Sequence, residues 1–68
     1  MDNRLVRFDS YVDNYSVRHI ESPVYVNPVY VVCLREGVCE TTEIVMCSGE
    51  RLFIPAVVDS VRDELENG

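Results

Sequence analysis

The alternation of apolar and polar residues predicts a β-hairpin in the second half of the chain. Residues 42–47 and 50–54 are two strand-like runs rich in branched and aromatic side chains, and Ser48-Gly49 separates them. A two-residue connection that contains glycine is typical of a tight hairpin, because glycine adopts positive φ without a steric penalty. We therefore expect two antiparallel strands joined by a two-residue turn, with Gly49 at positive φ.

The longest strand-like run covers residues 24–34 and contains several valines and tyrosines. Pro28 interrupts it, and because proline lacks an N–H group it marks a break, a bulge or a sheet edge. Asn27 precedes the proline and is expected to be extended. Residues 35–37 then predict a loop in which Gly37 supplies positive φ.

The N-terminal part of the chain predicts a further pair of strands. Residues 4–12 and 16–20 contain alternating apolar positions. Between them, Asp13-Asn14 tolerates the left-handed backbone of a turn. We expect these two segments to pair with each other.

The C-terminal segment predicts one amphipathic helix. Pro55 ends the preceding strand and suits the first turn of a helix over residues 57–65. Four apolar residues fall on one side of this helix: Val57, Val58, Val61 and Leu65. Glu64 and Glu66 lie at the negative end of the helix dipole, so the last turn is expected to fray.

These elements predict an α+β fold: a small antiparallel β-sheet of four to five strands with one C-terminal α-helix, in a single β-rich domain over residues 1–68. A chain of 68 residues buries only about 60% of the surface that it exposes when unfolded. Domains of this size usually depend on a staple, a metal or a partner subunit.

Charge and composition narrow the classes of partner. The chain has 12 acidic and 6 basic residues, for a net charge of −6, and this sign opposes contact with phosphates, so no nucleic acid partner is expected. No apolar run approaches the roughly 20 residues of a membrane span. The first residues also lack the features of a signal peptide. We therefore expect a cytoplasmic protein without a membrane contact.

Few residues offer catalytic or metal-binding chemistry. His19 is the only histidine, and no motif fixes two carboxylates together. The three cysteines, Cys33, Cys39 and Cys47, are an odd number and are expected to be reduced. A zinc site would need these thiols and His19, but the paired-thiol spacing of zinc knuckles is absent. The preferred interpretation makes Cys33 and Cys47 small buried side chains and Cys39 a loop residue, with no enzyme activity, no cofactor and no metal.

Four short patterns between residues 24 and 65 occur together. They are Val26-Asn27-Pro28 with Val31 and Leu34, alternating Thr42, Ile44 and Met46 before Ser48-Gly49, then Phe53-Ile54, and Val58 with Val61. In this arrangement the chain resembles the family of small flagellar and swarming motility proteins. The resemblance implies a small non-enzymatic regulator that works through protein contacts, and it carries over no catalytic residues.

The apolar surface predicts a partner. Alternation sends the apolar residues of segment 25–34 to both faces of a sheet, and one short helix covers only part of one face. We expect a homodimer or a complex with another protein, with Tyr25, Tyr30 and Val32 as the partner-binding residues.

The leading hypothesis for function is a protein-binding regulator or inhibitor, and a phage-encoded protein that acts on a host protein is one form of it. The alternatives are an oligomeric small-ligand binder with a pocket between subunits, a motility-type regulator, and a redox or metal module on the cysteines.

Overall fold

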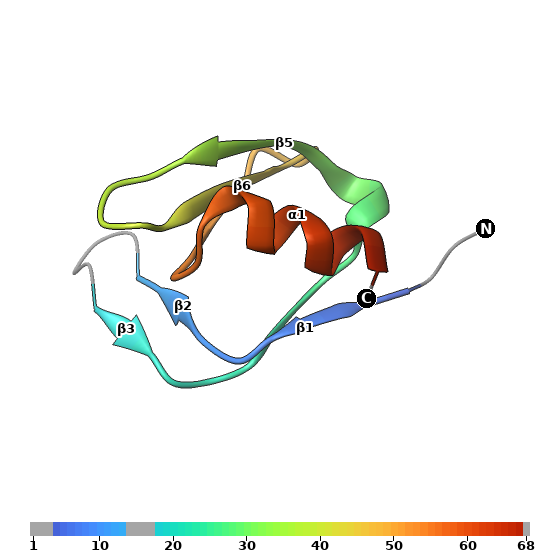
Figure 1. Cartoon of the computed structure of the whole chain (residues 1–68). Helices are drawn as coiled ribbons and strands as arrows, with labels where there is room; N and C mark the ends of the chain where they lie inside the picture. The colour runs from blue at the N-terminus through green and yellow to red at the C-terminus, as the bar shows by residue number, and fades with distance from the viewer. Residues whose placement is uncertain (1–3, 14–17, 68) are drawn as a thin grey trace.

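The computed structural model describes residues 4–13 and 18–67, which form two antiparallel sheets and one helix (Figure 1). The elements are β1 (Val6–Phe8), β2 (Tyr11–Val12), β3 (His19–Ile20), β4 (Val24–Val26), η1 (Pro28–Tyr30), β5 (Val31–Glu36), β6 (Thr42–Met46), β7 (Arg51–Ile54) and α1 (Val58–Asn67). Strands β3, β2, β7, β6 and β5 form a five-stranded sheet in that order, and β1 pairs with β4. The predicted α+β class, with a small antiparallel sheet and a C-terminal helix, is confirmed.

The N-terminal strands pair as a bent ribbon. Strands β2 and β3 are antiparallel with Val12 opposite His19, as the sequence predicted. Strand β1 pairs instead with β4, with Val6 opposite Val26. Strand β2 also pairs with β7, so β2 and β3 belong to the five-stranded sheet, whereas β1 and β4 form the two-stranded sheet. The predicted turn at Asp13-Asn14 includes Asn14, which lies outside the described residues.

The proline break in the long apolar run is confirmed. Residues from Pro28 form the 3₁₀ turn η1, which separates β4 from β5. Asn27 caps this turn, because its side-chain oxygen accepts a hydrogen bond of 3.0 Å from the Val29 N–H. The run therefore supplies one strand to each sheet.

The predicted hairpin is present, but its loop is one residue longer than expected. The Met46 N–H donates to the Glu50 carbonyl at 2.9 Å, and the Gly49 N–H donates to the Met46 carbonyl at 2.9 Å. The loop enclosed by this pair of hydrogen-bonded residues, Met46 and Glu50, therefore consists of Cys47, Ser48 and Gly49. Gly49 has φ +93°, which confirms the need for glycine at the end of a three-residue hairpin loop.

The loop between β5 and β6 differs from the prediction. Strand β5 continues to Glu36, so Arg35 and Glu36 belong to the strand and not to a loop. Positive φ falls on Cys39 (55°) and Glu40 (59°) instead of on Gly37. A Cβ atom at Gly37 would lie 2.3 Å from the Thr41 Oγ1 atom, so a larger residue would force the Thr41 hydroxyl to move.

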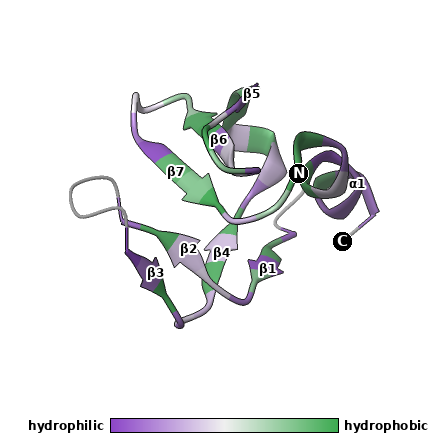
Figure 2. Cartoon of the chain, turned by 60° about the vertical axis from the view of Figure 1, so that its left-hand side comes forward, coloured by the Kyte–Doolittle hydropathy of each residue, from purple (hydrophilic) through white to green (hydrophobic). Residues whose placement is uncertain are grey.

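The core lies between α1, the β1–β4 pair and one face of the five-stranded sheet (Figures 1 and 2). Its buried members are Val6, Phe8, Val26, Ile44, Ile54, Val61 and Leu65. The predicted apolar side of the helix is correct for Val61 and Leu65, which are buried, and for Val58, which is half-buried. It is wrong for Val57, which is 47% exposed because it precedes the first turn of α1.

Helix α1 continues to Asn67, two residues beyond the predicted end. The expectation that its last turn frays stays a prediction. Arg4 contacts this end of the helix: its Nη2 atom donates to the Leu65 carbonyl at 2.8 Å and its Nη1 atom to the Glu66 carbonyl at 3.4 Å. A guanidinium group at a helix C-terminus satisfies free carbonyls and opposes the negative end of the dipole.

Candidate functional site

The three residues predicted to bind a partner are all exposed. Tyr25 on β4 is 56% exposed, Tyr30 at the end of η1 is 53% exposed, and Val32 on β5 is 64% exposed. None of them is used by the core of the described chain. Their role in binding stays a prediction.

A fourth exposed apolar residue accompanies two of these positions. Val29 in η1 is 60% exposed, so Val29, Tyr30 and Val32 fall within four consecutive residues; we call these three residues the β5-edge patch. Tyr25 is paired with Arg7 in the two-stranded sheet and is not part of this definition. Clustered apolar side chains that remain exposed are typical of interaction surfaces.

The outward position of Val32 has a local cause. Val31 lies opposite Met46 and Cys33 lies opposite Val45, so Val32 is an extra residue in a β-bulge. A bulge locally interrupts a ladder and redirects side chains. The Cys47 N–H donates to the Tyr30 carbonyl at 2.8 Å, which fixes the end of η1 against the loop after β6.

Strand β5 also has a free backbone edge. It is the last strand of the five-stranded sheet, and no other described strand pairs with its outer side. In an antiparallel pair, successive residues point their N–H and C=O groups alternately toward and away from the neighbouring strand. The Gly37 N–H points toward Thr41, to whose carbonyl it donates at 2.8 Å. By alternation along the β5–β6 register, Leu34 and Glu36 point theirs to the free edge.

The helix next to this edge is acidic. Helix α1 packs against β5 and carries four carboxylates, those of Asp59, Asp63, Glu64 and Glu66, all on exposed residues. Its one basic residue, Arg62, lies 3.6 Å from the carboxylate of Asp59. The region of β5 therefore combines an apolar patch with a negatively charged helix, while β5 itself carries one exposed basic and one exposed acidic residue, Arg35 and Glu36.

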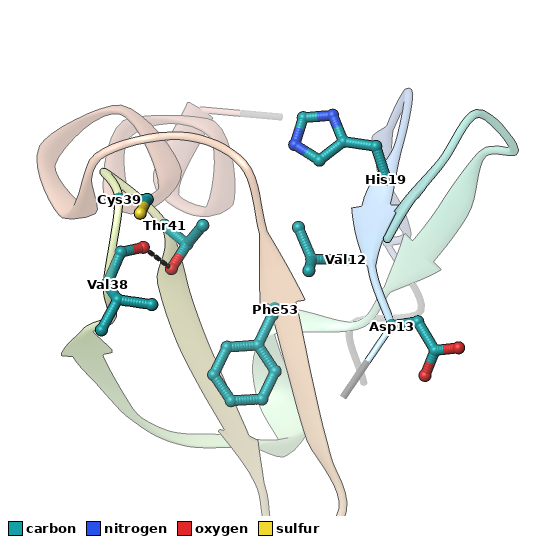
Figure 3. A pocket seen from close by; sticks show the side chains of 7 residues that line it. All are labelled: Val12, Asp13, His19, Val38, Cys39, Thr41 and Phe53. Carbon is teal, nitrogen blue, oxygen red and sulfur yellow. Dashed lines mark hydrogen bonds between the residues drawn. The ribbon is translucent and has the colours of Figure 1, made fainter. Parts of the chain in front are cut away.

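A second feature, on a different part of the molecule, is a pocket of about 420 Å³ (Figure 3). Its lining residues are Val12, Asp13, His19, Val38, Cys39, Thr41 and Phe53. Figure 3 shows Val38, Cys39 and Thr41 on one side, His19 on another, and Val12 and Phe53 between them. The volume falls in the range of small-molecule pockets, about 300–1,000 Å³.

The loop that forms one wall of the pocket is strained. The Thr41 N–H donates to the Val38 carbonyl at 3.2 Å and closes a four-residue turn. Both central residues of the turn, Cys39 and Glu40, have positive φ, which costs free energy for any residue other than glycine. The Thr41 hydroxyl also donates to the Val38 carbonyl at 2.7 Å, and this second bond helps to hold the turn.

The pocket brings the histidine and one thiol to the same cavity without joining them. His19 and Cys39 lie on different walls (Figure 3), and within residues 4–13 and 18–67 no hydrogen bond connects the two side chains. The Cys–His pairing that activates a thiol nucleophile is therefore not formed here. The carboxylate of Asp13 points away from the hollow (Figure 3).

All three cysteines are free thiols in the structure. Cys33 is half-buried on β5, as the preferred interpretation expected in part, and Cys39 lies in a loop. The expectation that Cys47 is buried is wrong, because it lies in the exposed loop after β6. Among the described residues, no group of three or more His, Cys, Asp or Glu side chains could hold a metal ion.

Several residues of these features escaped the analysis of the sequence. The exposure of Val29 could have been predicted from the sequence. Val29 directly follows Pro28, and at this break the alternation of the strand no longer determines the direction of the side chain. The pocket had none, because it depends on Val12 lying opposite both His19 and Phe53. Such long-range pairing is not visible in a local pattern.

Comparison with known proteins adds no relative. No family model, no curated protein and no solved structure matches the chain. The resemblance of residues 24–65 to the small motility proteins stays a prediction. Within the part of the chain that the structure describes, no helix has the length and apolar character needed to cross a membrane.

Proposed function

We propose that this protein is a non-enzymatic regulator or inhibitor that binds another protein through the β5-edge patch. One observation supports this most strongly: Val29, Tyr30 and Val32 are each more than half exposed and lie outside the buried core. A phage-encoded inhibitor of a host protein and a motility-type regulator are both members of this class.

The patch alone supplies only part of the binding free energy. Fully burying one such side chain is worth about 1.5–3 kcal/mol, so covering the exposed half of three gives roughly 2–4 kcal/mol. A micromolar complex needs about 8 kcal/mol. The remainder must come from neighbouring surface, and polar groups around an apolar centre are usual at protein interfaces.

The proposal is tested by affinity capture with three immobilised forms of the protein. We expect the wild type to enrich one or a few proteins from a lysate of its source cells, and Val32→Asp to lose them, since the change places a charge in the contact. Val38→Asp is the matched control, because Val38 is 75% exposed and lies outside the β5-edge patch, in the loop between β5 and β6. Equal capture by Val32→Asp and wild type, or no enrichment at all, would contradict the proposal.

The pocket supports a second candidate function, the binding of a small apolar molecule. Two features favour it: the volume of about 420 Å³ and the side chains of Val12, Val38 and Phe53 on the walls. Unlike the expected arrangement between subunits, this pocket lies within one chain. Native mass spectrometry tests it, with a co-purifying molecule expected from the wild type and absent from Val38→Asp. A chain that carries no added mass would argue against this function.

A further inference from the structure

The free edge of β5 has three properties that together describe the form of a partner. The backbone groups of Leu34 and Glu36 point outward without a neighbouring strand. The β5-edge patch lies at the start of the strand. The acidic helix α1 packs against the same strand. These are hydrogen-bonding, apolar and electrostatic features of β5 and of the two elements next to it, η1 and α1.

We propose that this edge binds an extended segment of the partner protein as an added β-strand, and that the segment carries basic side chains between apolar ones. The inference rests on the proposed function and specifies its partner. Strand addition supplies main-chain hydrogen bonds for affinity, while alternate side chains supply specificity.

The backbone determines how the added strand is held. Leu34 and Glu36 each offer one N–H donor and one C=O acceptor, so the edge can form four hydrogen bonds with an extended chain. The bulge at Val32 limits regular pairing at the other end of β5. There the side chains of Tyr30 and Val32 provide apolar contacts instead.

The net negative charge of this chain favours a basic partner segment over a second copy of the same chain. The net charge is −6, so two copies repel each other at long range, whereas a basic segment is attracted. The exposed acids Asp63 and Glu64 on α1 lie on the helix that packs against β5 and attract lysine or arginine side chains of the added strand.

Glu36 offers a test that separates strand pairing from general attraction between charges. Glu36→Pro removes the N–H that faces the free edge, and proline is tolerated where that group faces solvent. Glu36→Ala is the matched control, because it removes the same carboxylate and keeps the N–H. Equal thermal unfolding midpoints of the two variants would show that both are folded.

The probe is a fluorescein-labelled ten-residue peptide of alternating valine and lysine, with binding followed by fluorescence polarisation. We expect wild type and Glu36→Ala to bind it, and Glu36→Pro to bind at least roughly tenfold more weakly, because one hydrogen bond and the fit of the added strand are lost. The same peptide with every backbone nitrogen methylated, which leaves no N–H donor on either edge, should bind the wild type weakly. This second arm remains informative if Glu36→Pro does not fold.

The outcomes distinguish this inference from the proposed function. Equal binding of the peptide by Glu36→Pro and Glu36→Ala, or no loss on methylation, overturns strand addition. A dimer in sedimentation equilibrium that Glu36→Pro dissociates would assign the edge to a second copy and also overturn it. If Val32→Asp loses the captured protein but Glu36→Pro keeps it, the proposed protein-binding function is supported and strand addition is overturned.

Discussion

Truncation of Val61 to alanine tests how α1 is attached to the sheet. Val61 is 1% exposed and belongs to the core cluster with Ile44 and Ile54. Losing two buried carbon groups costs about 1.6 kcal/mol. An incompletely collapsed cavity adds up to about 1 kcal/mol, and the higher helix propensity of alanine returns roughly 0.5 kcal/mol. The expected net loss is about 1–2 kcal/mol.

Urea unfolding followed by circular dichroism measures this loss, with Val57→Ala as the control. Val57 is 47% exposed and precedes the helix, so its truncation should cost no more than about 0.8 kcal/mol. For a domain of this size, the loss at Val61 corresponds to a decrease in Tm of roughly 5–15 °C. A Val61→Ala variant no less stable than Val57→Ala would refute the packing described for α1.

Three further substitutions test local features of the fold. Gly37→Ala should cost about 1–3 kcal/mol, because its Cβ atom would meet the Thr41 hydroxyl at 2.3 Å; an unchanged unfolding midpoint would contradict this. Thr42→Val should cost about 1–3 kcal/mol in the same assay, since the buried Thr42 hydroxyl donates to the Ala56 carbonyl at 2.7 Å. Arg4→Gln should speed amide hydrogen exchange in the last turn of α1, and unchanged exchange there would show that the guanidinium does not hold the turn.

Much of the fold could be predicted because its signals are local. The hairpin of β6 and β7 follows from alternation and Gly49, and the helix follows from the spacing of Val58, Val61 and Leu65. The break at Pro28 follows from the chemistry of proline. In each case the residues that carry the signal are also the residues that form the element.

The remaining features depend on contacts between distant segments. The capping of α1 joins Arg4 to the carbonyl of Leu65, across most of the chain, and no local pattern encodes it. Positive φ at Cys39 and Glu40 is imposed by the closure of the loop, whereas the sequence favoured Gly37. Part of the site could be predicted from the sequence. Tyr30 and Val32 were predicted from an excess of apolar residues, but the free edge beside them depends on the strand order.

Site-specific photocrosslinking tests the central claim, that the β5-edge patch contacts another protein, most directly. A photoreactive phenylalanine analogue would replace Tyr30 in one form of the protein and Val38, in the loop between β5 and β6, in another; both positions are more than half exposed. After irradiation in source cells, we predict a discrete crosslinked product of higher mass from position 30 and none from position 38. No product from position 30, or the same products from both positions, would contradict the account.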